Sequence, residues 1–172
     1  MTEAVKLMIE RRSVRQYKPE QIKEEQLNEI LEAGKYAASG MGRQPVKMVV
    51  VQDKKTIAQL SKMNAKIMGT DSDPFYGAPT VIVVMADRTA STHYADGCLT
   101  MGNLMNAAYA VGVDSCWINR ATEEFDSDEG KELLKKWGIS GDYEGIGHCI
   151  LGYHDGDYPI AAKRKDDFVI RI

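Results

Sequence analysis

Three arginines and one serine stand within five residues near the start of the chain, in the segment Arg11-Arg12-Ser13-Val14-Arg15. A guanidinium group is a planar fork of donors that suits phosphate oxygens, and three of them close together repel one another unless a negative group offsets their charge. The segment therefore predicts an anion site, with phosphate as the anion. A helix end whose dipole is complemented by cations explains the same residues equally well, so both interpretations stand at this point.

A second basic cluster, Lys163-Arg164-Lys165, lies near the other end of the chain. A charge run of this kind is most often solvated. The whole chain has a net charge of −3, which argues against a general nucleic-acid binder, because such proteins hold phosphate backbones with surplus cations. The two basic clusters share one phosphate only if the fold brings them together.

The cysteines and histidines show neither metal-ligand spacing nor a disulfide framework. The cysteines are odd in number and have apolar neighbours, which indicates reduced, buried thiols at Cys98, Cys116 and Cys149. No apolar run approaches the roughly 18 residues of a membrane span, and the first residues are polar and amphipathic rather than a signal sequence. These features predict a soluble, cytoplasmic protein that binds neither membranes nor nucleic acid.

Hydrophobic periodicity predicts helices and strands that alternate along the chain. Helices are expected over residues 5–9, 22–34, 57–68, 94–112 and 129–137. Strands are expected over residues 48–51, 80–85, 113–118, 146–153 and 168–172, the first two of them buried. Because no linker or repeat interrupts this order, the sequence predicts one domain, residues 1–172, of α+β or α/β class with a central sheet.

Two connecting segments differ from the rest in composition. Residues 37–45 are small and punctuated by glycine, but Gly40-Met41-Gly42 is followed by Arg43 and not by a third glycine that opens a helix, so this is no dinucleotide-binding fingerprint. Residues 69–79 are polar and broken by proline and glycine. We expect them to form a mobile, lid-like loop.

The helix expected over residues 94–112 carries apolar or small side chains around nearly its whole circumference. Such a helix must be buried on almost every side, and a domain of this size has difficulty burying one alone. A partner subunit in a symmetric dimer would cover the remaining surface. We therefore expect a homodimer.

The order of five motifs along the chain resembles that of the nitroreductase family. The motifs are Arg11-Arg12-Ser13-Val14-Arg15, Ala38-Ser39-Gly40-Met41-Gly42-Arg43-Gln44-Pro45, Gly112-Val113-Asp114-Ser115-Cys116-Trp117-Ile118, Leu151-Gly152-Tyr153 and Lys163-Arg164-Lys165. Each is weak alone, but together they cover essentially the whole chain. The resemblance implies an α+β homodimer with a mostly antiparallel sheet, a C-terminal strand exchanged with the partner subunit, and two FMN molecules at the subunit interface.

The resemblance also implies an FMN-dependent oxidoreductase with NADH or NADPH as electron donor. A flavin accepts hydride at N5 and passes electrons on, so this chemistry requires no catalytic side chain. The expected acceptor is a small molecule such as a nitroaromatic or a quinone, reduced in ping-pong order.

The family's cofactor residues map onto three parts of this sequence. Those expected to hold the phosphate, ribityl chain and pyrimidine edge are Arg11, Arg12, Ser13 and Arg15, with Lys163 and Lys165 completing the phosphate site and Arg164 facing solvent. Those that match a loop approaching the flavin from the second subunit are Ser39, Gly40, Met41 and Gln44. Those that match a strand end against the isoalloxazine, with backbone amides toward N5 or O4, are Cys116, Trp117, Ile118 and Asn119.

The chain departs from the family pattern at Gly42, where asparagine is usual, and at Val46, where an aromatic residue is usual. It is also short for the family, which leaves residues 69–79 as the candidate cover of the substrate pocket. The missing amide at Gly42 leaves open a dimer that binds or buffers FMN without turnover. Different chemistry on the same flavin, and a dimer that binds another anion through both basic clusters, are the further alternatives.

Overall fold

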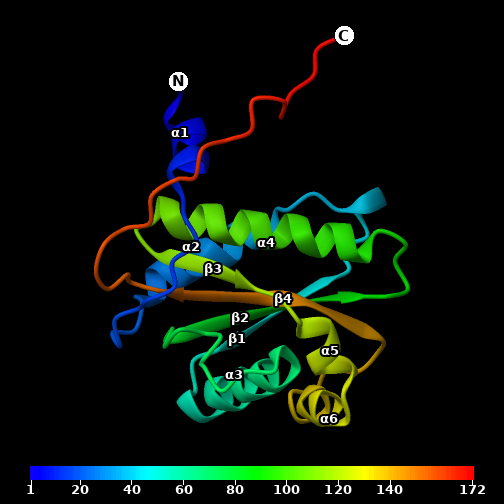
Figure 1. The fold of residues 1–172 in the computed structure, drawn as a ribbon. Coiled ribbons are helices and arrows are strands. Elements are labelled where there is room, and N and C mark those ends of the chain that lie inside the picture. Colours follow the sequence, from blue (N-terminus) through cyan, green and yellow to red (C-terminus); the bar gives the residue numbers. More distant parts are fainter.

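The computed structural model describes residues 1–172 and has a four-stranded sheet at its centre (Figure 1). The strands are β1 (Val46–Val51), β2 (Thr80–Asp87), β3 (Asp114–Ile118) and β4 (Tyr143–Gly152), in the spatial order β1-β2-β4-β3. All three neighbouring pairs are antiparallel. The α+β fold class with an antiparallel sheet flanked by helices is confirmed.

Helices cover both faces of the sheet (Figure 1). One face is covered by α2 (Glu24–Lys35) and α4 (His93–Ala110), and the other by α3 (Lys54–Met68), α5 (Ala121–Asp126) and α6 (Asp128–Lys136). The short helix α1 (Glu3–Glu10) stands apart and has no buried residue. No helix is both long and apolar enough to cross a bilayer.

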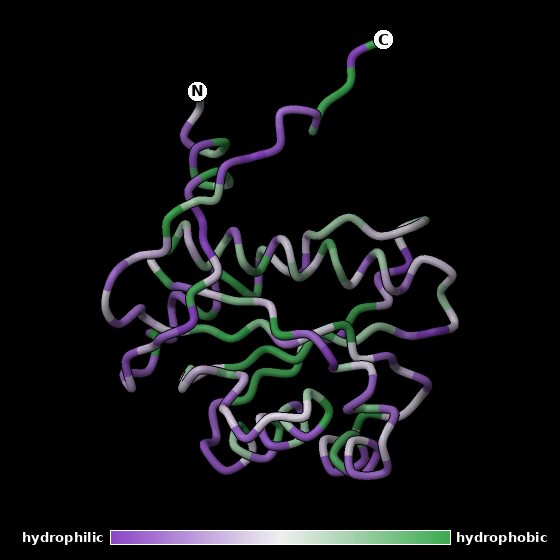
Figure 2. The backbone as a smooth tube through the Cα atoms, viewed as in Figure 1, coloured by the Kyte–Doolittle hydropathy of each residue, from purple (hydrophilic) through white to green (hydrophobic).

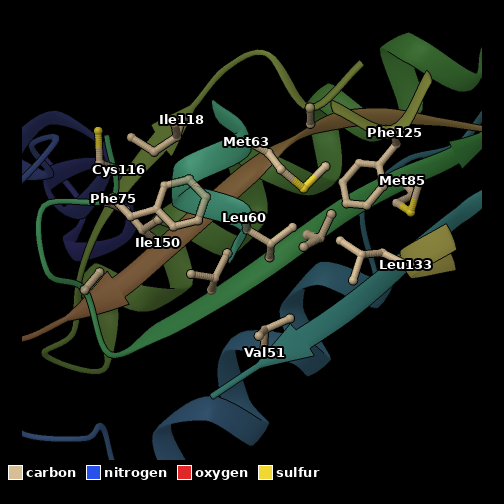
Figure 3. Packing of buried hydrophobic residues seen from close by; sticks show 14 of the residues in the cluster. Val51, Leu60, Met63, Phe75, Met85, Cys116, Ile118, Phe125, Leu133 and Ile150 are labelled. Carbon is tan, nitrogen blue, oxygen red and sulfur yellow. The ribbon is translucent and has the colours of Figure 1, made fainter. Parts of the chain in front are cut away.

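Strand β2 supplies side chains to two separate cores, because successive residues of a strand point to opposite faces. The core beneath α3, α5 and α6 receives Val81, Val83 and Met85, and the core beneath α2 and α4 receives Ile82, Val84 and Ala86. Figure 3 shows the first of these cores, where Leu60 and Met63 of α3 lie close to Phe125 of α5 and Met85 of β2. This double burial explains why the sequence of β2 is an uninterrupted apolar run.

The five predicted helices are present, but two expectations, the burial of β1 and the mobility of residues 69–79, are wrong. Strand β1 is an edge strand rather than a buried one, and Val50 is 37% exposed. Helix α4 is buried on its sheet side and open on the other, where Leu99 is 50% exposed in the single chain; the expected partner subunit would cover this side. Residues 69–79 are irregular yet anchored, because Phe75 is fully buried and the Asp73 carboxylate accepts from the Ser61 hydroxyl at 2.6 Å. The segment is therefore not a freely hinged cover.

The two chain termini extend away from the sheet as arms (Figures 1 and 2). We call α1 the N-terminal arm and residues 159–172 the C-terminal arm. The strand predicted at residues 168–172 does not form within the chain: these residues pair with nothing, and Phe168 is 76% exposed. A strand requires a neighbouring strand, and the outer edge of β3 is already occupied by the segment around Ser13.

Candidate functional site

The arginine segment, residues 11–15, is held against the outer edge of β3. Helix α1 ends at Glu10, and the chain then runs extended, so that Ser13 forms a parallel bridge with Ser115 and the Val14 amide donates to the Ser115 carbonyl at 3.0 Å. Val14 is itself buried in the core. The apolar residue in the middle of the motif therefore fixes its polar neighbours beside β3.

Arg12 has two roles within the chain. Its Nη1 donates to the carbonyls of Ile9 and Arg11, both at 2.7 Å, which caps the end of α1. Its Nε, together with Nη1 of Arg11, is buried and has no hydrogen-bond partner in the chain. The helix-end interpretation is therefore correct for one nitrogen of Arg12, and it leaves two guanidinium nitrogens without a partner. Buried donors without partners are costly, and an anion is the group that satisfies them best.

Cys116 of β3 lies within the electrostatic reach of this segment. Burial raises the pKa of its thiol, whereas the charge of Arg15 and a hydrogen bond from Ser13 lower it. Burial also raises the pKa of Cys149 to about 12. All three cysteines are free thiols, and Cys116 and Cys149 are buried. These thiols stay protonated near neutral pH, so Cys116 is a packing neighbour of the arginines and not a nucleophile.

The loop containing Ser39, Gly40, Met41 and Gln44 is fixed to the start of α4. The Gly40 amide donates at 3.0 Å to the carboxylate of Asp96, which is 3% exposed and also accepts from the Thr92 hydroxyl at 2.9 Å. A Cβ at Gly40 would lie 2.3 Å from Thr92 Oγ1, so only glycine fits there. Met41 has a φ of 54° and is 75% exposed, so its side chain points away from its own chain into solvent.

The arginine segment and this loop lie at opposite ends of α4. Near the C-terminal end of the helix, the Tyr109 hydroxyl lies 3.5 Å from a Glu10 carboxylate oxygen, and the Arg12 amide donates to the Tyr158 hydroxyl at 3.1 Å. Asp96, which holds the loop, stands 13 residues before Tyr109, or about 20 Å along a helix. A single chain therefore does not bring the loop to the arginines.

The remaining predicted site residues divide between the sheet and the C-terminal arm. Trp117 and Ile118 belong to β3, and Asn119 follows its last residue, exposed to solvent. Lys163, Arg164 and Lys165 are exposed, and Lys163 pairs with Asp166 at 3.5 Å. The C-terminal segment approaches the arginines through Tyr158 and not through these cations.

Sequence reasoning missed two residues that support the site. Asp96 is a carboxylate on a largely apolar helix, and its isolation among apolar residues is a signal that it has a buried partner. Tyr158 contacts Arg12 across 146 positions of sequence, and no local sequence pattern predicts a contact over that separation.

Comparison with known proteins agrees with this architecture. The model of the nitroreductase family matches residues 8–72 and 67–153. A protein of Archaeoglobus fulgidus that carries the provisional name NADH dehydrogenase/NAD(P)H nitroreductase is 30% identical over 139 residues, which cover 78% of this chain and 77% of that protein.

Two solved structures superpose over nearly all of the chain. A nitroreductase with bound FMN from Bacteroides fragilis has a TM-score of 0.92 at 26% identity, with all of both chains covered. A nitroreductase with bound FMN from Desulfitobacterium hafniense has a TM-score of 0.87 at 27% identity and covers 99% of this chain and 98% of its own. The chain belongs to the nitroreductase family.

Proposed function

We propose that this chain is an FMN-dependent NAD(P)H oxidoreductase that reduces nitroaromatics, quinones or related small molecules in ping-pong order. The observation that carries the proposal is the pair of buried, unpartnered guanidinium nitrogens of Arg11 and Arg12 beside β3. The similarity to nitroreductases with bound FMN supports the FMN phosphate as the anion that would bind there. Bound FMN would accept hydride from NAD(P)H and pass electrons to the acceptor.

The donors present fit the phosphate end of FMN. Arg11 and Arg12 offer guanidinium nitrogens that lack partners, and Ser13 and Arg15 stand beside them at the β3 edge. Arginine donors match phosphate oxygens in geometry and charge. Lys163 and Lys165 would complete this site once the C-terminal arm is ordered by a partner subunit, with Arg164 facing solvent.

The strand end formed by Cys116, Trp117, Ile118 and Asn119 would lie against the isoalloxazine. The positive charge of Arg15 is close enough to lower the pKa of Cys116, so it also favours negative charge on a ligand held beside this strand. The protein's contribution is thus to bind, orient and electrostatically tune the cofactor.

A second copy of the chain would complete the site. The open side of α4 carries Ala95, Leu99, Gly102 and Asn106 at helical spacing, and a Cβ at Gly102 would meet nothing within 4 Å in the single chain. Two copies related by a two-fold axis perpendicular to α4 would place the helices antiparallel. The start of one α4, with its loop of residues 39–44, would then lie beside the end of the other, with its arginine segment.

Flavin titration and anaerobic reduction test this function. The chain is stripped of flavin, titrated with FMN while flavin fluorescence is followed, and then mixed anaerobically with NADH or NADPH. We expect tight binding, loss of the oxidised-flavin absorbance with at least one nicotinamide, and its return on adding a quinone or a nitroaromatic.

The same experiment separates the alternatives. A chain that binds FMN but leaves it oxidised with both nicotinamides would be an FMN-binding or FMN-buffering protein, the alternative raised by Gly42. A chain that does not bind FMN would rule out every flavin function and leave the dimer that binds another anion.

A further inference from the structure

A fully buried polar cluster lies directly beneath the end of β3, on the side away from α4. Its centre is Asn64 of α3, which is 0% exposed. The Asn64 amide nitrogen donates to the Asn119 carbonyl at 2.7 Å and to the Glu124 carboxylate, and its amide oxygen accepts from Arg120 Nε at 2.9 Å. One side chain thus binds both residues that follow the strand.

The orientation of the Asn64 amide is fixed by what surrounds it. Glu124 is fully buried and accepts from Nε2 of the equally buried His148 at 3.0 Å. The Phe75 ring packs on His148 with centroids 5.0 Å apart. A carboxylate and a carbonyl can only accept, whereas a guanidinium can only donate, so a flipped Asn64 amide would lose all three hydrogen bonds.

Arg120 has a backbone conformation that favours glycine, with a φ of 75°. Its Nε is held by Asn64, and its carbonyl accepts from the Glu124 amide at 3.0 Å. A left-handed arginine at the end of a strand persists only when its surroundings hold it there. The groups that bind Arg120 there are the Asn64 amide oxygen and the Glu124 backbone amide.

These contacts determine where the peptide between Asn119 and Arg120 points. Every peptide bond in the chain is trans, so the carbonyl and the amide of this peptide face in opposite directions. The Asn119 carbonyl points inward to Asn64. The Arg120 N–H therefore points outward, and it has no acceptor in the chain.

We propose that Asn64 is a positioning residue that fixes the Asn119–Arg120 peptide so that its amide donates to the N5 and O4 edge of the flavin. The inference rests on the proposed function, because it needs FMN at the end of β3. Loss of Asn64 would free this peptide to rotate, which would weaken FMN binding and move the reduction potential of the bound flavin. A side chain that only stabilised the fold would lower thermal stability and leave the potential unchanged.

The test uses Asn64→Leu, Arg120→Gly and the double variant, with Gln59→Leu as the matched control. Gln59 lies on the same helix and donates to Glu129 at 2.9 Å, away from the β3 end. FMN affinity is measured on the apoprotein, and the midpoint potential of the bound flavin is measured by titration against a reference dye. Helical content and oligomeric state show which variants are folded.

We expect Asn64→Leu to lose at least about tenfold in FMN affinity, the factor for one hydrogen bond whose partner stays buried, and to shift the midpoint potential. Arg120→Gly should lose less, and the double variant should lose no more than Asn64→Leu, because both changes break the same arrangement. Gln59→Leu should match the wild type.

Wild-type affinity and potential in a folded Asn64→Leu variant would reject the inference, as would additive losses in the double variant. If Asn64→Leu does not fold, the smaller change Asn64→Ser decides by the same two measurements: an unchanged potential in the folded variant rejects the proposal and a shifted one supports it. A wild type that fails to bind FMN overturns the proposed function itself. If the wild type binds FMN and its flavin is reduced by NAD(P)H, but the variants have the same FMN affinity and midpoint potential as the wild type, only the role of Asn64 is overturned.

Discussion

The sheet and the helices that cover it, which we call the body, bury most of their apolar side chains, whereas the terminal arms expose theirs to solvent. In the body, Leu104 and Ile150 are fully buried and Phe125 is 1% exposed. In the arms, Ile9 is 53% exposed and Ile170 is 82% exposed. Apolar side chains that a chain leaves in water gain free energy when another surface covers them. The body is thus stabilised by contacts within one chain, whereas in the dimer that we propose the arms would contact the second copy.

The arginine segment is the junction between these two regions. On one side it ends α1, and on the other it is bound to β3 through Ser13 and Val14. An anion bound there would therefore contact the edge of β3 on one side. The arms and a partner subunit would shield its other side from solvent. Substitutions on the two sides of this segment should therefore affect folding, association and cofactor binding separately.

The largest effect is expected for Leu104→Glu. Leu104 is fully buried between α4 and the sheet, and an uncompensated buried carboxylate costs about 3–5 kcal/mol, a large part of the stability of a whole domain. We expect an unfolded or insoluble chain, as judged by circular dichroism and by recovery of soluble protein. A soluble Leu104→Glu variant with wild-type helical content would show that the body does not depend on this face of α4.

Leu99→Glu is the matched change on the outward side of the same helix. Leu99 is 50% exposed, so the free energy of unfolding of a single chain should change by no more than about 0.5 kcal/mol. In a dimer built on α4 it would lie at the interface, where loss of an anchoring side chain weakens association by about 2–4 kcal/mol. Sedimentation equilibrium measures this, and a variant that dimerises like the wild type would place the interface elsewhere.

Arg12→Ala should weaken FMN binding by about 1.5–3 kcal/mol, the range for a charge-assisted hydrogen bond. Because Arg12 also caps α1, Arg15→Ala is measured beside it: Arg15 has no such contact, and we expect a loss in the same range. Fluorescence titration of the apoprotein gives both affinities.

Arg164→Ala serves as the control for those two variants, since it removes the same charge from an exposed position that we do not assign to the phosphate site. Its FMN affinity should stay within about 0.5 kcal/mol of the wild type. Equal losses in all three variants would mean that only net charge matters, and unchanged affinity in Arg12→Ala and Arg15→Ala would show that the phosphate lies elsewhere.

The predictability of each element follows from the range of the interactions that specify it. Strand β2 and helix α2 follow from local apolar patterns, and both are present where these patterns place them. Helix α5 has only six residues and begins after an arginine, so it gives no periodic signal. The strand expected at residues 168–172 needs a neighbour that a single chain does not supply.

The supporting residues of the site were less predictable than the site motifs. The arginine motif is compact in sequence, and it does lie together in the fold beside β3. Asp96 reaches Gly40 across 56 positions and Asn64 reaches Asn119 across 55, so their roles exist only after the chain has folded. A short motif can therefore be read from the sequence as a proposed ligand site, whereas the residues that orient that motif depend on tertiary contacts.

The smallest effect is expected for Gly42→Asn, a change in the loop that we expect to lie beside the flavin held by the second copy. Gly42 has a φ of 65°, a conformation that asparagine tolerates, and a Cβ there would meet nothing within 4 Å. Stability should change by no more than about 0.5 kcal/mol, while an added amide near a flavin held by the second copy should strengthen binding by about 0.5–1.5 kcal/mol. Gly40→Ala, which would clash with Thr92, should instead disrupt the loop.

Because residues 39–44 cannot reach the arginines of their own chain, the gain in FMN affinity from Gly42→Asn must disappear when Leu99→Glu prevents association. A gain that persisted in such a monomer would mean that the loop acts within its own chain, and it would remove the geometric reason for a shared site.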